Sequence, residues 1–85
     1  MAYFIQFTPA AARQFQRLEA SIQRRIGTAI DGLIQNPRPP GAKKLKGAQD
    51  LWRIRIGDYR VIHQIHDAQL LIIIVTIGHR GDVYR

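Results

Sequence analysis

The sequence contains no cysteine among its 85 residues, which excludes disulfides and thiolate metal sites. Its start, MAYFIQFTPAA, lacks the basic region and long apolar core of a signal peptide. Its longest apolar run, residues 70–75, is far shorter than the roughly 20 residues that a membrane-spanning helix needs. We therefore expect a cytoplasmic protein with no membrane segment.

Acidic residues are also scarce, with six Asp and Glu against thirteen Lys and Arg and a formal net charge of +7. The few carboxylates are scattered along the chain, so no carboxylate cluster for two metal ions is expected. Such a surplus of positive charge repels itself in a compact domain. It therefore indicates an anionic partner: nucleic acid, an acidic protein or an anionic membrane.

The usual motifs of metal and nucleotide sites are absent: there is no HExxH, no paired Cys/His spacing and no phosphate-binding glycine loop. His63 and His66 lie three residues apart in an expected strand, so they face opposite sides. His63 is better explained as a partly buried core residue. An enzyme built from this chain is expected to use neither metal nor cofactor. Metal-free RNA cleavage uses the 2′-OH of the substrate, and the protein then supplies a base, an acid and cations.

A chain of this length is expected to form a single domain, residues 1–85. Residues 3–7 are aromatic and β-branched, which favours a strand. Thr8 followed by Pro9 is typical of a helix start, and Ser21 is a candidate cap for a second helix. Asn36-Pro37 is expected to end that helix. Its apolar stripe comprises Ile22, Ile26, Ile30, Leu33 and Ile34.

Residues 37–47 form a loop with Pro and Gly that contains Lys43, Lys44 and Lys46. Three strands follow, over 51–56, 59–66 and 70–77, and the last is apolar on both faces, which suits a central position. The predicted fold is α+β with the order β-α-α-β-β-β. Two N-terminal helices pack on one face of a mainly antiparallel sheet.

The segment LWRIRIGDYR, residues 51–60, carries the main functional signal. Alternation sends Trp52, Ile54 and Ile56 toward the helices and the intervening arginines to the other face. If Gly57-Asp58 closes a two-residue hairpin, the residues before and after it pair in register, and Arg55 pairs with Arg60. Like charges directly opposite each other destabilise a hairpin.

On alternation alone, an ordinary solvated strand face explains Arg53 and Arg55 as well as a binding site does. A cluster of Arg53, Arg55 and Arg60 beside the lysine loop favours an anion-binding face, because arginine is well shaped for phosphate. The end of the last strand should lie near the Gly57-Asp58 turn, which would let Arg80 and Tyr84 approach the arginines. From its position alone, an ordinary frayed terminus is the slightly better explanation of that tail.

At these residues the chain resembles the RelE branch of the RelE/ParE toxin superfamily. The similarity covers nearly the whole chain and includes KKLKG, LWRIRIGDYRVIHQI and the terminal IGHRGDVYR. The resemblance implies a toxin that enters the ribosomal A site and cuts messenger RNA. It also implies a cognate RelB-like antitoxin as partner, together with the ribosome carrying mRNA.

The resemblance also implies roles for individual residues. Arg60 and Arg80 would hold the scissile phosphate, with Arg80 assisting the leaving 5′-oxygen, and Tyr84 would stack on a base. The three lysines of the loop, Lys43, Lys44 and Lys46, would contact RNA phosphates.

The chain departs from the family pattern at Arg53 and Arg55, where the family often has lysines, one of them a proposed general base. Arginine is a poor base because its pKa lies above 12. These two residues are therefore expected to act electrostatically, and His79 is a local candidate for the base because imidazole titrates near neutrality.

Two alternatives remain open at this point. A ParE-like gyrase poison would have the same fold without catalysis, although such a poison needs no phosphate site. A non-catalytic module would use the arginine face to bind nucleic acid or the antitoxin.

Overall fold

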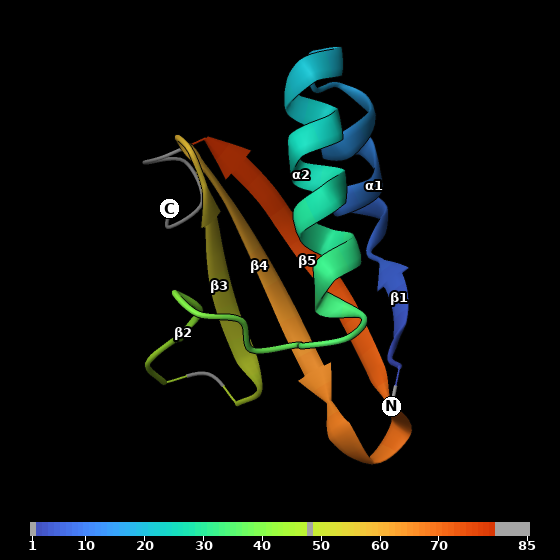
Figure 1. Ribbon diagram of the computed structural model, residues 1–85, viewed down its shortest axis with the longest axis vertical. Helices are drawn as coiled ribbons and strands as arrows, with labels where there is room; N and C mark the ends of the chain where they lie inside the picture. Colours follow the sequence, from blue (N-terminus) through green and yellow to red (C-terminus); the bar gives the residue numbers. More distant parts are fainter. Residues whose placement is uncertain (1, 48, 80–85) are drawn as a thin grey trace.

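A computed structural model of the chain describes residues 2–47 and 49–79. Five strands form one mixed sheet in the order β1-β5-β4-β3-β2 (Figure 1). Strand β1 (Phe4–Phe7) runs parallel to its neighbour β5 (Leu71–His79), an interior strand, and the other pairs are antiparallel. The predicted α+β order is confirmed, with one addition: Lys43–Lys44, expected in a loop, forms the short edge strand β2.

The first helix, α1 (Pro9–Gln16), begins as predicted. The Thr8 hydroxyl oxygen accepts a hydrogen bond from the Ala11 N–H at 3.1 Å, and Pro9 occupies the first turn. The second helix, α2 (Ala20–Leu33), has Glu19 rather than Ser21 at its cap position. The prediction for Ser21 was wrong: it lies inside the helix, where its hydroxyl donates to the Glu19 carboxylate.

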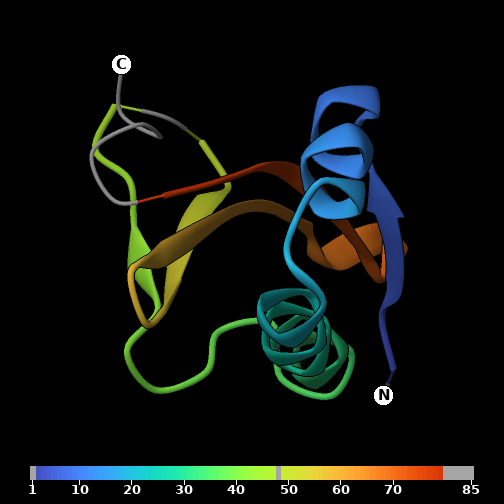
Figure 2. The ribbon, with the colours of Figure 1, turned by 90° about the horizontal axis from the view of Figure 1, so that it is seen from above.

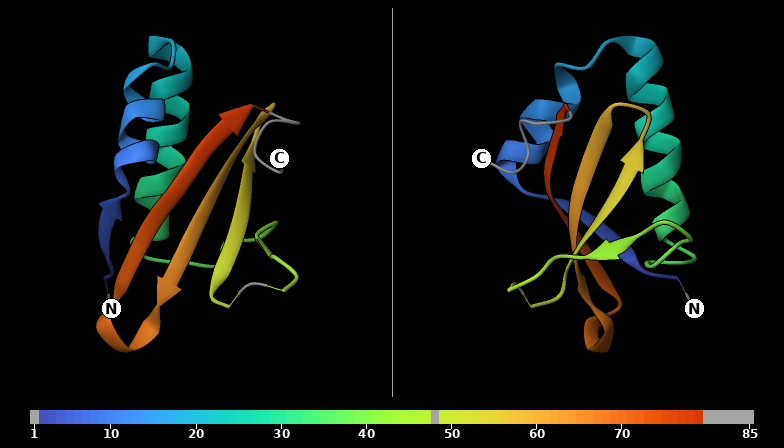
Figure 3. Two further views of the ribbon diagram at one scale, coloured as in Figure 1. Left: turned by 180° about the vertical axis from the view of Figure 1, so that it is seen from behind. Right: turned by 90° about the vertical axis from the view of Figure 1, so that its left-hand side faces the viewer.

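The two helices pack on the sheet in different ways. Helix α2 lies over one face, and α1 lies beside the upper part of β5, beyond the end of β1 (Figure 3). The Gln14 side chain covers the edge of β5 there, because its carbonyl accepts from the Ile77 N–H at 2.7 Å and from the Thr76 hydroxyl. That edge is thereby closed to other strands.

The core lies between the helices and one face of the sheet. Its buried members come from α1, α2 and strands β3 (Leu51–Ile56), β4 (Tyr59–His66) and β5. Three residues of the predicted helical stripe, Ile26, Ile30 and Leu33, are buried, and the other two are partly buried, which confirms the periodicity. The buried cluster comprises Ala11, Ile26, Ile30, Leu33, Ile54, Val61, Ile72, Ile74 and Ile77.

A β-bulge sets the orientation of the upper half of β5. The register runs from His63↔Ile74 to Ile62↔Thr76, so Val75 is the extra residue. Ile74 and Ile77 consequently both face the core although they are three residues apart. Residues after the bulge have the opposite orientation from that of an unbroken alternation.

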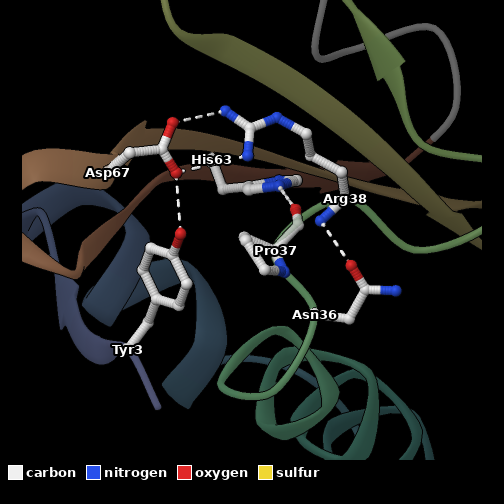
Figure 4. Close-up of polar contacts among 6 residues, drawn as sticks. All are labelled: Tyr3, Asn36, Pro37, Arg38, His63 and Asp67. Atoms are coloured by element: carbon white, nitrogen blue, oxygen red, sulfur yellow. Dashed lines mark hydrogen bonds and ion pairs between the residues drawn. The ribbon is translucent and has the colours of Figure 1, made fainter. Parts of the chain in front are cut away.

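The connection after α2 is fastened across the lower end of the sheet (Figure 4). Arg38 forms an ion pair with Asp67 at 2.8 Å, and Asp67 also accepts a hydrogen bond from the Tyr3 hydroxyl. The Arg38 guanidinium lies 5.2 Å from the centre of the Trp52 ring. Together these contacts fix where the chain leaves α2 and turns toward β2.

His63 of β4 also contacts the connection after α2, through Pro37. Its ring is fully buried, and Nε2 lies 2.9 Å from the Pro37 carbonyl oxygen. Nδ1 has no hydrogen-bond partner among the described residues. Burial lowers the pKa of His63 below its ordinary value, so the ring is neutral in the folded protein near pH 7. The expectation of a core histidine is confirmed.

The buried His63 makes the free energy of unfolding depend on pH. Its folded pKa lies below the unfolded value of about 6.5, so between these two values the unfolded chain binds the extra proton. We expect the free energy of unfolding to fall as the pH is lowered through this range. Urea titrations between about pH 8 and 5.5 measure this. The His63→Gln variant should lose this dependence and the control His66→Gln should keep it; equal profiles would contradict the account.

Candidate functional site

The β3–β4 hairpin is built around the Gly57-Asp58 turn. Gly57 has φ 60°, whereas Asp58 is not among the residues with positive φ, which is the pattern of a type II′ turn. Arg25 of α2 packs against this turn, and its Nη2 lies 3.1 Å from the place where a Cβ of Gly57 would be. The positive φ favours glycine at this position, and a Cβ there would also require the Arg25 guanidinium to move by a few tenths of an ångström.

The hairpin places Arg55 directly opposite Arg60, as predicted. In a two-residue hairpin the closing pair, here Ile56 and Tyr59, exchanges both hydrogen bonds. Arg55 and Arg60 then form the next, non-hydrogen-bonded pair, whose Cα atoms are about 4.5 Å apart and whose side chains lie closest. The two cations thus share one face of the sheet at the tightest spacing that antiparallel strands allow.

A second pair of like charges lies beside the first. Strand β2 brings Lys43 opposite Arg53, and residues that pair directly project from the same face of a sheet. We call the four residues Lys43, Arg53, Arg55 and Arg60 the cation face. It lies on the side of the sheet opposite the core residues Ile54 and Val61.

Arg53 differs from its prediction in one respect, because only 8% of it is exposed. Arg53 pairs with Lys43 of β2 on one side and with Ile62 of β4 on the other. Its Nε is buried without a hydrogen-bond partner among the described residues. A buried donor without a partner costs about 1–3 kcal/mol, so an incoming acceptor would gain from this position.

Strand β5 completes the geometry around Arg60. Because of the bulge, the residue beside Arg60 on β5 is Gly78, which places no side chain on the cation face. His79 projects from the other face, where its ring meets Tyr59 edge-on with the ring centres 5.3 Å apart. The structure therefore brings His79 to the correct end of the sheet but not to the face that holds Arg60.

The other predicted site residues have different positions. Lys44 pairs with Trp52 and so projects away from the cation face, and Lys46 is exposed in the loop after β2. Arg80 and Tyr84 lie outside the residues that the structure describes. The Lys43–Arg53 pair could not be predicted from the sequence, because a two-residue strand has no recognisable pattern. The position of Gly78 beside Arg60 could not be predicted either, because the bulge that puts it there has no clear sequence pattern.

No cluster of three or more His, Asp or Glu side chains suited to a metal ion occurs within residues 2–47 and 49–79. In the same part of the chain, neither helix has the length and apolar character that crossing a membrane requires. Arg38 forms an ion pair with Asp67, which follows the end of β4 opposite to the Gly57-Asp58 turn.

The repulsion between the charges of the cation face should lower the free energy of unfolding by a measurable amount. We expect Arg55→Gln to raise the free energy of unfolding by some tenths of a kcal/mol, up to about 1, because it removes the like-charge pairing with Arg60. The gain should shrink in high salt, which screens the repulsion. Urea denaturation at low and high ionic strength measures both effects.

The matched control is Arg24→Gln, which removes the same charge from an exposed position on α2. It should change the stability less than Arg55→Gln does. A loss of stability in Arg55→Gln at low salt would show that the pairing is not repulsive.

Comparison with known proteins identifies the family of the chain. A family model described as the ParE toxin of the type II toxin–antitoxin system parDE matches residues 5–84. The toxin RelE of Mycobacterium tuberculosis is 33% identical over 84 residues, covering 98% of this chain and 87% of the relative. The mRNA interferase toxin RelE of Escherichia coli K12 is 26% identical over 88 residues, covering 99% and 92%.

Solved structures agree with these sequence relatives. The archaeal RelE–RelB complex from Pyrococcus horikoshii superposes with a TM-score of 0.84 at 31% identity, covering 98% of this chain and all of the other. The family model is named for ParE, whereas the sequence and structural relatives are named for RelE. The chain belongs to the RelE/ParE family of type II toxin–antitoxin toxins and is a RelE-type member of it.

Proposed function

We propose that this chain is the toxin of a type II toxin–antitoxin system, an mRNA interferase that cuts messenger RNA in the ribosomal A site and thereby inhibits translation. The observation that carries the proposal is the cation face, in which Arg55 and Arg60 are paired against their mutual repulsion. The relative from Escherichia coli K12 is named an mRNA interferase toxin. Such a protein acts in the cytoplasm, where ribosomes are.

The proposed reaction uses the RNA itself as nucleophile. The ribose 2′-oxygen attacks the adjacent phosphorus, the bond to the 5′-oxygen breaks, and the products carry a 2′,3′-cyclic phosphate and a 5′-hydroxyl. One proton leaves the 2′-OH and one is delivered to the 5′-oxygen. The phosphorus gains negative charge on the way, which positioned guanidinium groups stabilise.

The residues divide this work as follows. Arg60, which lies beside Gly78 of β5 and directly opposite Arg55, holds the scissile phosphate. Arg55 and the largely buried Arg53 stabilise the developing charge, since arginine cannot act as a base near neutral pH. Arg80, proposed to assist the leaving oxygen, and Tyr84, proposed to stack on a base, follow from the family pattern alone.

Three lysines and a partner protein also have proposed roles. Lys43, Lys44 and Lys46 contact RNA phosphates around the cut, and Lys43 is the one that shares the cation face. The partner is a RelB-like antitoxin encoded alongside. The Pyrococcus horikoshii relative was solved as a RelE–RelB complex, which supports this partner.

The proposal predicts that Arg60→Gln loses cleavage through the chemical step. Removing one group that stabilises developing charge lowers kcat by roughly 100- to 1,000-fold. Single-turnover cleavage of mRNA on programmed ribosomes measures this, with Arg24→Gln as the charge-matched control. Binding to the ribosome should change far less than the rate. A variant that cuts at the wild-type rate would remove Arg60 from the site.

Substrate chemistry offers an independent test of the mechanism. An mRNA with a 2′-deoxynucleotide on the 5′ side of the cut should resist cleavage completely, because the nucleophile is missing. Fragments from ordinary mRNA should end in a 2′,3′-cyclic phosphate. Cleavage of the deoxy substrate at the normal rate would rule out attack by the 2′-OH.

His79 is tested separately, because its orientation argues against direct proton transfer at Arg60. A general base contributes about 100- to 10,000-fold, and it must reach the proton it removes. With His79 against Tyr59 on the other face, we expect His79→Ala to lower single-turnover cleavage by less than about tenfold, well below that range. A loss of 100-fold or more, accompanied by an altered pH profile, would instead identify His79 as the base.

The name of the matching family model keeps a gyrase poison as the alternative. One comparison separates the two: purified protein with translating ribosomes, with free RNA, and with gyrase and supercoiled DNA. Cuts that appear only on ribosomes support the proposal. Linearised DNA without RNA cuts would contradict it, and slowed growth with neither activity would indicate a non-catalytic binding module.

A further inference from the structure

A charged cluster lies at the end of the sheet opposite to the Gly57-Asp58 turn, and the proposed RNA site does not use it (Figure 4). The two terminal nitrogens of Arg38 donate to the two carboxylate oxygens of Asp67, at 3.3 and 2.8 Å. The backbone N–H of Arg38 donates to Asn36 Oδ1 at 3.2 Å, and its guanidinium lies over the Trp52 ring. One arginine thus joins the connection after α2 both to β3 and to the residue that follows β4.

The contribution of this ion pair to stability does not account for its geometry. The Arg38 and Asp67 side chains are 39% and 56% exposed, and ion pairs in contact with water add little to the free energy of unfolding. A two-point contact between a guanidinium and a carboxylate does, however, fix the relative position of the two groups. The pair therefore matters more for where it holds the connection than for the stability that it adds.

The connection that continues from Arg38 has little conformational freedom. It loops outward from α2 and returns to β2 at the edge of the sheet (Figure 2). Residues 37–42, PRPPGA, contain three of the four prolines of the chain, and each proline ring fixes φ at about −65°. The last four form a turn, closed by a hydrogen bond from the Ala42 N–H to the Pro39 carbonyl oxygen at 2.9 Å. Its third residue, Gly41, has φ 89° and follows a proline, the pattern of a type II turn. A displacement of Arg38 is therefore transmitted to β2.

Strand β2 depends on such support because it has only two residues. It pairs with Trp52 and Arg53, and a short two-stranded pairing is marginal on its own. After β2, the Leu45 N–H donates to the Leu51 carbonyl oxygen at 2.9 Å. Before β2, the connection is held to the sheet at Arg38.

The position of β2 in turn affects the cation face. Strand β2 carries Lys43, which lies opposite Arg53. Since Leu45 and Leu51 are joined by a hydrogen bond, Lys43 and Arg53, two residues farther along each strand, form the next hydrogen-bonded pair. The Arg53 N–H therefore points toward β2, and a shift of β2 would move Lys43 and break that backbone contact.

We propose that Arg38, anchored by Asp67, is a positioning residue for the cleavage of RNA. It acts through the rigid connection on β2 and so determines where Lys43 lies beside Arg53. Arg38 itself does not contact the RNA. This inference rests on the proposed function, because the groups that Arg38 positions belong to the cation face.

Opposite changes of charge distinguish positioning from a direct contact with RNA. Arg38→Gln removes a positive charge and Asp67→Ala a negative one, yet both release the connection from the end of β4. Both should lower single-turnover cleavage of mRNA on programmed ribosomes by roughly 10- to 100-fold, the cost of a misplaced group. Binding to the ribosome should change far less than the rate. Arg38→Lys keeps the charge without the planar fork, so its rate should lie between those of wild type and Arg38→Gln. Cleavage by Asp67→Ala at or above the wild-type rate would overturn the proposal.

Two matched controls make the same changes of charge at exposed positions of α2. Arg24→Gln removes a positive charge and Asp31→Ala a negative one. Both should leave cleavage unchanged, because neither residue touches the connection. A loss in Asp31→Ala as large as that in Asp67→Ala would mean that the net charge alone sets the rate, and would overturn the proposal.

Amide hydrogen exchange tests the link to β2 without any RNA. The Arg53 N–H points toward β2, whereas the N–H of the next residue, Ile54, points toward β4. Arg38→Gln should speed exchange at Arg53 and leave Ile54 protected, because β2 separates while the rest of the sheet stays folded. Unchanged exchange at Arg53 would overturn the proposal. Equal acceleration at both residues would show a general loss of stability and would overturn it too.

A double variant tests whether the effect passes through Lys43. In a chain that already carries Lys43→Gln, the further change Arg38→Gln should lower cleavage by a smaller factor than it does in the wild-type chain. Equal factors in the two backgrounds would mean that Arg38 acts independently of β2, which contradicts the proposal.

These measurements separate the failure of the two proposals. Absence of cleavage by the wild-type protein would defeat the proposed function, while exchange at Arg53 would still decide whether Arg38 holds β2. Normal cleavage by both Arg38→Gln and Asp67→Ala would overturn the positioning role and leave the ribonuclease supported.

Discussion

The like-charge pairing of Arg55 with Arg60 is the constraint around which the rest of the hairpin is arranged. The two residues occupy a non-hydrogen-bonded position, where side chains of neighbouring strands lie closest. Their backbone cannot separate them, because the opposite faces of the same strands hold Ile54 and Val61 in the core. Burial of apolar surface thus holds together two charges that repel each other, and an anion bound between them would reverse the sign of that interaction.

Local features of the chain determine which groups surround this pair. The positive φ of Gly57 sets a two-residue turn and therefore the register that makes Arg55 and Arg60 partners. The bulge at Val75 places Gly78 next to Arg60 and directs His79 to the other face. If the register His63↔Ile74 continued unbroken, Ile77 would lie beside Arg60 and His79 would project from the same face as Arg60, so the chemistry available to the site would differ. The bulge therefore determines which β5 side chains share the face that holds Arg60.

Much of this could be predicted from the sequence, because it depends on strict periodicity and short-range signals. The Thr8-Pro9 helix start, the apolar stripe of α2 and the Arg55–Arg60 register all follow from local pattern. Three features could not be predicted. Strand β2 is too short for a pattern, and the bulge breaks the alternation on which the pattern depends. The burial of Arg53, which lies between β2 and β4 in the sheet, depends on contacts that its own alternation does not indicate.

The most direct measurement of the central claim is a double-mutant cycle on Arg55 and Arg60, each changed to Gln, read as the free energy of unfolding. It is carried out without ligand and again with a short RNA made uncleavable by 2′-O-methyl groups. The account predicts an unfavourable coupling between the two arginines in the free protein that becomes favourable when RNA is bound. A coupling near zero in both states, or one that RNA leaves unchanged, would contradict the claim that these residues are paired to hold a phosphate.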